Sequence, residues 1–141
     1  MSYSFSKENI SFRFSNKDLI IRWLDKSIKS EKHKPGDISF IFCSDKYLLG
    51  INKQYLNHNY FTDIITFDYT QDKLVSGDLF ISIDRVLDNA KTYAVTFQEE
   101  LLRVLIHGVL HLCGYKDKTK AAASLMRQKE DYYLSLYTKL K

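Results

Sequence analysis

The stretch TFQEELLRVLIHGVLHLCG, residues 96–114, is strongly apolar and forms the best-defined helix that the sequence predicts. Thr96 and Glu99 have the spacing of a capping box, which indicates that the helix begins near Phe97. Gly114 occupies the position after a helix end that often requires a left-handed backbone, so the helix is expected to end near Cys113. The other predicted elements lie before and after this helix along the chain.

The segment upstream alternates between strand and helix signals. Residues 10–14 (ISFRF) and 37–43 (DISFIFC) have the patterns of strands. Between them, a helix capped by Ser15 or Asn16 places its apolar residues on one face, and Ser44 opens a short helix after the second strand. If nothing inserts between the two strands, a right-handed crossover makes them parallel neighbours in one sheet.

Two further strands and three helices complete the predicted chain. Residues 62–69 (TDIITFDY) and 77–83 (GDLFISI) are expected to form a hairpin. Residues 84–93 have a helical pattern, and Thr119 can cap a last helix after the central one. The order β-α-β-α-β-β-α-α-α predicts an α+β fold, a single domain over residues 1–141 with a small mixed sheet of about four strands packed against helices.

Composition excludes several classes of protein. The 141 residues fit one domain, and Lys and Arg exceed Asp and Glu by 21 to 17, a net charge of +4 that is compatible with a polyanionic partner. Only Cys43 and Cys113 are cysteines, which favours a reducing cytoplasm over secretion. Neither a signal peptide nor an apolar stretch of the ~18 residues that span a bilayer is found, so no membrane association is expected.

The central helix carries the residues with the strongest chemical signal. His107 and His111 are four residues apart, so both imidazoles project from one helix face and can share a metal ion. Asp117 follows beyond the turn at Gly114 and can complete a three-ligand site on the helix and the turn after it. Three protein ligands with one open position are typical of catalytic zinc, whereas four are typical of structural zinc. Arg103 lies one turn earlier on the same face.

The histidine pair has two other possible interpretations, a core pair and a protease site. Two helical histidines can be a satisfied core pair, but Gly108 between them costs about 1 kcal/mol relative to alanine, which calls for the close approach of a backbone or a ligand. A metalloprotease of the H-E-x-x-H type would have its general base at this position. Because Gly108 stands there, the protease interpretation loses most of its support.

The stretch HGVLHLCGYKD, residues 107–117, resembles the H-G-x-L-H-L-x-G-Y-D-H signature of the YbeY family of bacterial metal-dependent endoribonucleases of ribosomal RNA maturation. The resemblance extends over about residues 37–117. Upstream matches occur in the family's order: Asn52 and Tyr55 in an L-N-x-x-Y element, residues 62–67 (TDIITF) in T-D-V-L-S-F and residues 77–81 (GDLFI) in G-D-I-x-I.

The resemblance implies one Zn²⁺ held by His107, His111 and Asp117, where Asp117 replaces the family's usual third histidine. An oxygen ligand reaches zinc at a similar distance of ~2.0–2.2 Å. The family's arginine after the L-N-x-x-Y tyrosine, which faces RNA phosphate, is Leu56 here. Arg103 is the nearest substitute for this arginine by position, and Lys53 is another. The predicted catalytic residues are therefore Arg103 and the two histidine ligands, His107 and His111.

The function expected from this resemblance is a cytoplasmic, single-strand-specific endoribonuclease. Its implied substrate is precursor ribosomal RNA, including the 3′ end of the small-subunit RNA, and its implied partners are ribosomal particles and assembly factors; no DNA is expected. Two alternatives stay open: a non-catalytic RNA-binding assembly factor with a structural metal, and a metal-dependent hydrolase of another substrate. Four protein ligands would favour the first alternative, and the absence of salt-sensitive RNA binding would favour the second.

Overall fold

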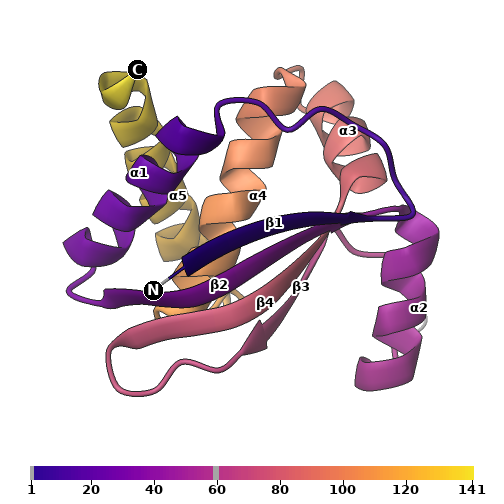
Figure 1. Cartoon of the computed structure of the whole chain (residues 1–141), viewed down its shortest axis with the longest axis horizontal. Coiled ribbons are helices and arrows are strands. Elements are labelled where there is room, and N and C mark those ends of the chain that lie inside the picture. The colour runs from indigo at the N-terminus through magenta and orange to yellow at the C-terminus, as the bar shows by residue number, and fades with distance from the viewer. Residues whose placement is uncertain (1, 59–60) are drawn as a thin grey trace.

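A computed structural model of the chain describes residues 2–58 and 61–141, and within these residues it contains a four-stranded sheet and five helices (Figure 1). The strand order is β1-β2-β4-β3, with β1–β2 and β2–β4 parallel and β3–β4 antiparallel. The predicted α+β fold with a mixed sheet is therefore confirmed. The elements are β1 (Ser2–Glu8), α1 (Lys17–Ser30), β2 (Lys34–Cys43), α2 (Asp45–Leu56), β3 (Ile64–Asp68), β4 (Leu74–Ser82), α3 (Ile83–Thr92), α4 (Phe97–Leu112) and α5 (Lys120–Leu140).

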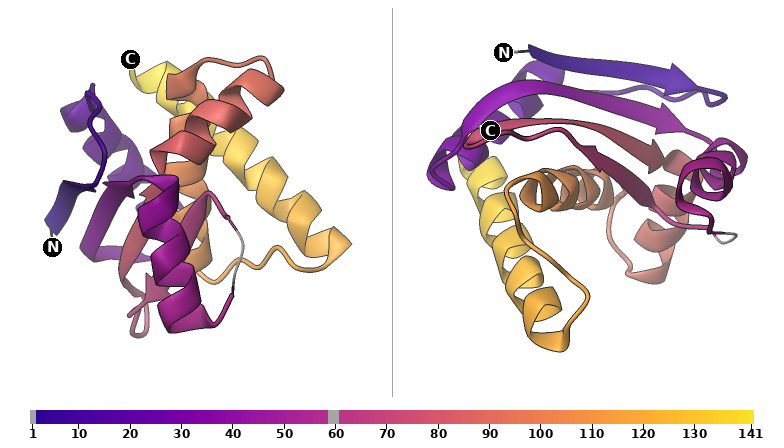
Figure 2. Two further views of the ribbon diagram at one scale, coloured as in Figure 1. Left: turned by 90° about the vertical axis from the view of Figure 1, so that its right-hand side faces the viewer. Right: turned by 90° about the horizontal axis from the view of Figure 1, so that it is seen from below.

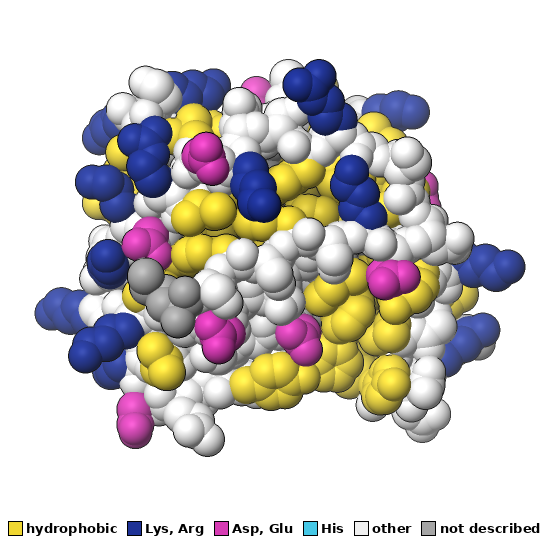
Figure 3. Space-filling view, viewed as in Figure 1, with side chains coloured by type: hydrophobic (Ala, Val, Ile, Leu, Met, Phe, Trp, Pro, Cys, Tyr) yellow, Lys and Arg dark blue, Asp and Glu magenta, His cyan; other side chains and the backbone are white. Residues whose placement is uncertain are grey.

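The sheet forms one layer, and α3, α4 and α5 lie together on one side of it, with α2 at its end (Figure 2). Helix α4 is central because it packs against β3 and β4 as well as α3 and α5. Its apolar sequence follows from this position, since ten of its residues are buried. On the face seen in Figure 3, hydrophobic side chains are exposed between charged ones, and no histidine side chain is visible.

Gly108 allows α4 to approach the sheet closely. A Cβ atom at this position would lie 2.1 Å from Leu79 Cδ2 and 2.7 Å from Ile64 Cδ1, closer than non-bonded carbon atoms approach. The close approach expected from the sequence is thus made by apolar side chains of β3 and β4. Gly108 is explained by helix–sheet packing, and it does not by itself indicate a ligand.

The first strand differs from the prediction. Residues 10–14 are irregular, and the strand is β1, whose residues Ser2 to Glu8 pair in parallel with Asp37 to Cys43. Both segments alternate apolar and polar residues, but Phe12 and Phe14 pack their partly buried rings against Phe42 without joining the sheet. Alternation reports which side chains are buried, whereas hydrogen bonding to β2 decides which segment becomes a strand.

The predicted helix caps are mostly confirmed. Ser44, Thr96 and Thr119 each accept a hydrogen bond from a backbone N–H three residues later, as N-cap residues do. Asn16 precedes α1 in a left-handed conformation without a side-chain cap bond.

Within the described residues, none of the helices combines the length and apolar character that crossing a membrane requires.

Candidate metal centre

Three possible ligand atoms from α4 and the loop after it meet at one point. The Nε2 atoms of His107 and His111 are 3.0 Å apart, and Asp117 Oδ2 lies 3.3 Å from each of them. The two rings are partly buried and Asp117 is more exposed, so the group is accessible to solvent. The structure therefore brings together the three residues that the sequence predicted as ligands.

The turn after α4 places Asp117 beside the histidines. Gly114 has a φ of +105°, in the left-handed region that favours glycine, and Tyr115 N–H donates to the Leu110 carbonyl at 3.0 Å. These two features reverse the chain direction, so Asp117 returns to the helix face of His107 and His111. Thr119, rather than Asp117, caps α5, which leaves the Asp117 carboxylate to the histidines.

Hydrogen bonds at the opposite ring nitrogens determine what the two Nε2 atoms offer. His111 Nδ1 lies 2.9 Å from the Tyr115 carbonyl oxygen, which can only accept, so this Nδ1 is the donor. His107 Nδ1 donates to Glu130 Oε2 at 2.6 Å. In the neutral rings, both Nε2 lone pairs therefore point at the space that Asp117 Oδ2 also faces. When both rings are neutral, three Lewis bases therefore converge at this point.

This donor set fits a zinc-like cation. Bonds of ~2.0–2.1 Å around a tetrahedral ion place neighbouring ligand atoms about 3.3 Å apart, close to the separations of 3.0 and 3.3 Å in the triad. The charged groups around His107 also favour a positive charge at this site. Burial disfavours the imidazolium, but the hydrogen bond and charge of Glu130, together with Asp117 and Asp63, raise the pKa of His107 above its ordinary value. A proton and a metal ion therefore compete for this ring.

Two cavities meet at the triad. One has a volume of about 330 Å³ and extends along α4 and α5. The other, of about 550 Å³, lies toward α2 and β3 and includes Lys116 and Lys118. Asp63, His107 and Asp117 line both cavities, so the triad has open space on two sides. Burial raises the pKa of the Asp63 carboxyl.

Comparisons with known proteins show the family to which this chain belongs. The profile of the family described as Endoribonuclease YbeY matches residues 2–138. The chain belongs to the YbeY endoribonuclease family. Proteins named Endoribonuclease YbeY from Flavobacterium johnsoniae and Flavobacterium psychrophilum are each 52% identical to the chain, over 89% and 95% of it and 91% and 95% of their own lengths. The resemblance to the YbeY family seen in the sequence is thereby confirmed.

A solved structure shares the YbeY-type fold of the chain. The solution structure of TM1509 from Thermotoga maritima superposes with a TM-score of 0.69 and covers 96% of this chain and 89% of its own. Its sequence identity is 24%, so the likeness shows the fold alone.

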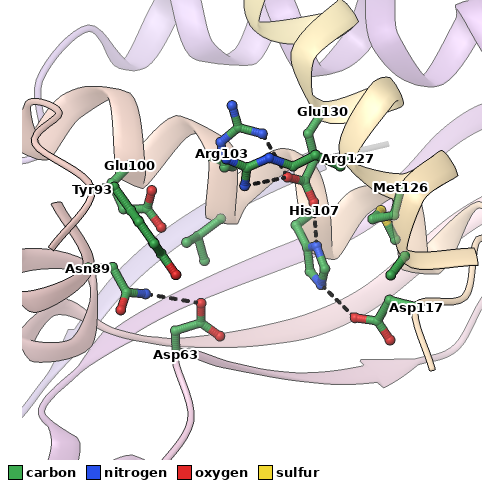
Figure 4. A pocket seen from close by; sticks show the side chains of 12 residues that line it. Asp63, Asn89, Tyr93, Glu100, Arg103, His107, Asp117, Met126, Arg127 and Glu130 are labelled. Atoms are coloured by element: carbon green, nitrogen blue, oxygen red, sulfur yellow. Dashed lines mark hydrogen bonds and ion pairs between the residues drawn. The ribbon is translucent and has the colours of Figure 1, made fainter. Parts of the chain in front are cut away.

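Glu130 is a site residue that the sequence analysis missed. It lies on α5, is 4% exposed, and accepts hydrogen bonds from both His107 Nδ1 and, at 2.9 Å, Arg103 Nη1 (Figure 4). Burial alone would raise its pKa, but hydrogen bonds from His107 and Arg103 hold the pKa of Glu130 below its ordinary value. Its ionised carboxylate therefore orients the His107 ring, as outer partners of metal-binding histidines do.

The sequence does contain a signal for Glu130. On α5 the buried residues Met126, Glu130, Tyr133 and Tyr137 recur at helical spacing. A carboxylate on such an apolar stripe needs a partner inside the protein, because an unpaired buried charge is costly. The identity of that partner, however, depends on how α5 packs against α4.

Arg103 lines the smaller cavity together with His107 and Asp117. Its guanidinium pairs with two carboxylates of α5, Glu130 at 2.9 Å and the exposed Asp131 at 2.7 Å. Leu56, which stands in place of the family's arginine, lines the larger cavity on the other side of the triad. Arg103 is thus part of an ion-pair network with α5. The substrate role that the sequence predicts for Arg103 stays a prediction.

Proposed function

We propose that residues 1–141 form a single metal-dependent endoribonuclease domain that cleaves single-stranded RNA. The observation that carries this proposal is the convergence of His107, His111 and Asp117 between two open cavities in a member of the YbeY endoribonuclease family. The proposed substrate is precursor ribosomal RNA, including the 3′ end of the small-subunit RNA. The family resemblance supports action in the cytoplasm, with ribosomal particles and assembly factors as partners.

In this proposal, His107, His111 and Asp117 hold one Zn²⁺ ion. When bound, such an ion polarises a phosphoryl oxygen and lowers the pKa of a coordinated water. Glu130 and the Tyr115 carbonyl keep both Nδ1 atoms protonated, so that the Nε2 atoms remain directed at the site. Lys116 and Lys118, which line the larger cavity, attract the RNA backbone to the triad.

The number of candidate ligands supports an enzyme over an assembly factor with a structural metal. In the part of the chain that the structure describes, the group that could hold an ion has three members, His107, His111 and Asp117. Three protein ligands leave a coordination position for water or substrate, whereas structural zinc is almost always enclosed by four.

Asp117 provides the direct test of the metal site and of the proposed function. Asp117→Asn is expected to lower zinc affinity and RNA cleavage by at least about tenfold, because a neutral amide is a poorer ligand than a carboxylate. Asp117→His is expected to retain both, since imidazole restores the family's usual ligand. Metal content by mass spectrometry and cleavage of a single-stranded RNA measure these effects. Wild-type zinc affinity and activity in Asp117→Asn would show that Asp117 is not a ligand.

We also propose that Arg103 stabilises charge on the substrate phosphate. Arg103→Ala is then expected to lower RNA cleavage by about a hundredfold with the metal site saturated, a typical loss for a charge-stabilising donor. Glu130 keeps its bond from His107 in this variant, so a change of only a few degrees in melting temperature is expected. If excess zinc restores full cleavage to Arg103→Ala, Arg103 acts only by holding Glu130, and its substrate role is wrong.

A further inference from the structure

Tyr93 is an exposed aromatic residue in the wall of the smaller cavity. It follows the last turn of α3, and 58% of its surface is accessible to solvent. Figure 4 shows its ring extending into the cavity, with the hydroxyl end toward Asn89 and Asp63. The ring also lines a neighbouring cavity of about 520 Å³ that continues along α4 and α5. One face of the Tyr93 ring is therefore accessible in the cavity that His107 and Asp117 also line. Packing of the core does not require an aromatic ring at this position.

One side of this cavity favours hydrogen-bond donors over anions. Its wall contains the carboxylates of Asp63 and Glu100, and Asn89 Nδ2 donates to Asp63 Oδ2 at 3.5 Å. The two arginines of the cavity, Arg103 and Arg127, lie on its other side in Figure 4, beside Glu130. The side of the wall with Asp63 and Glu100 therefore repels a phosphate group, whereas the N–H groups of a nucleobase would find carboxylate and carboxamide acceptors there.

We propose that the smaller cavity binds one unpaired nucleobase of the RNA, with the Tyr93 ring stacked on the base and Asp63 or Asn89 accepting its N–H groups. This inference rests on the proposed function and adds a base-binding subsite to it. The volume of about 330 Å³ lies at the lower end for ligand pockets, which suits a single base beside the phosphate at the triad. In a duplex, the N–H groups of a base are paired and its faces are stacked, so double-stranded RNA cannot fill the subsite.

Binding of short RNA oligonucleotides tests this subsite independently of metal chemistry. Fluorescence anisotropy in the presence of EDTA compares a single-stranded oligonucleotide with the same backbone made abasic. Stacking of one base is worth about 1–3 kcal/mol, so Tyr93→Ala is expected to weaken binding of the normal oligonucleotide by roughly fivefold to hundredfold. Binding of the abasic oligonucleotide is expected to stay unchanged. Tyr93→Phe keeps the aromatic face and is expected to bind both as the wild type does.

Tyr69→Ala is the matched control. Tyr69 is also 58% exposed but lies in the β3–β4 hairpin, away from α3 (Figure 1). Its removal is expected to leave binding of both oligonucleotides unchanged. A melting temperature close to that of the wild type excludes an indirect effect of Tyr93→Ala, since an exposed side chain contributes little to stability.

Three results would overturn the base subsite: wild-type affinity in Tyr93→Ala, equal losses on the normal and abasic oligonucleotides, or a loss in Tyr93→Phe as large as in Tyr93→Ala. The proposed nuclease activity fails separately. If Tyr93-dependent binding is observed but the zinc-loaded protein cleaves no RNA, the subsite stands and the nuclease proposal is wrong.

Discussion

His111→Ala is expected to abolish stable zinc binding and to reduce RNA cleavage by about a thousandfold or more. Removal of this ring leaves His107 and Asp117 as the only members of the triad, and half of a tetrahedral coordination sphere then falls to water. A bound ion contributes several kcal/mol of transition-state stabilisation, and each 1.4 kcal/mol corresponds to about tenfold in rate. Metal analysis of the purified variant and cleavage of single-stranded RNA measure both losses.

His33→Ala is the control for His111→Ala. His33 follows α1, and its Nδ1 atom lies 2.7 Å from the Glu31 carbonyl oxygen, outside the triad. We expect this variant to bind zinc and cleave RNA as the wild type does. After treatment with a chelator, added Zn²⁺ should restore cleavage to the wild type and to His33→Ala, but not to His111→Ala. One equivalent of tightly bound zinc in His111→Ala would refute the proposed site.

Glu130→Ala is expected to have the largest effect on folding. Loss of a buried ion-pair partner typically costs 3–5 kcal/mol, and about 3 kcal/mol is expected here because Arg103 retains Asp131. The His107 ring also loses its orienting acceptor, so zinc affinity should fall by about tenfold to hundredfold. Denaturant unfolding and competitive zinc titration measure the two effects.

Two further variants separate the stability effect from the metal effect. Glu130→Gln keeps the shape of the side chain but removes its charge, so it is expected to unfold less readily than Glu130→Ala while still binding zinc more weakly than the wild type. Asp131→Ala removes the other partner of Arg103, a residue that is 60% exposed. Its expected cost is below about 1 kcal/mol, with unchanged zinc affinity. Wild-type zinc affinity in Glu130→Gln would show that Glu130 does not position His107.

Local signals explain why much of the fold was predictable. Helix α4 was recognisable because its apolar residues, its capping box at Thr96 and its terminal Gly114 all lie within a single stretch. The hairpin of β3 and β4 was recognisable in the same way, from two strand-like segments and a polar loop. The prediction of a strand at residues 10–14 is wrong because alternation of apolar and polar residues is equally compatible with burial outside a sheet.

In the candidate site, too, some relations between residues are local in the sequence and others depend on tertiary packing. The sequence alone determined that His107 and His111 share a helix face and that a carboxylate follows a helix stop, because both relations depend on nearby residues and regular backbone geometry. Only the tertiary structure decided that Glu130 orients His107, that Arg103 joins this network, and that Tyr93 stands in the cavity wall. These three relations depend on how α3, α4 and α5 pack together. Packing is a property of the whole core, so the spacing of residues along one helix does not specify it.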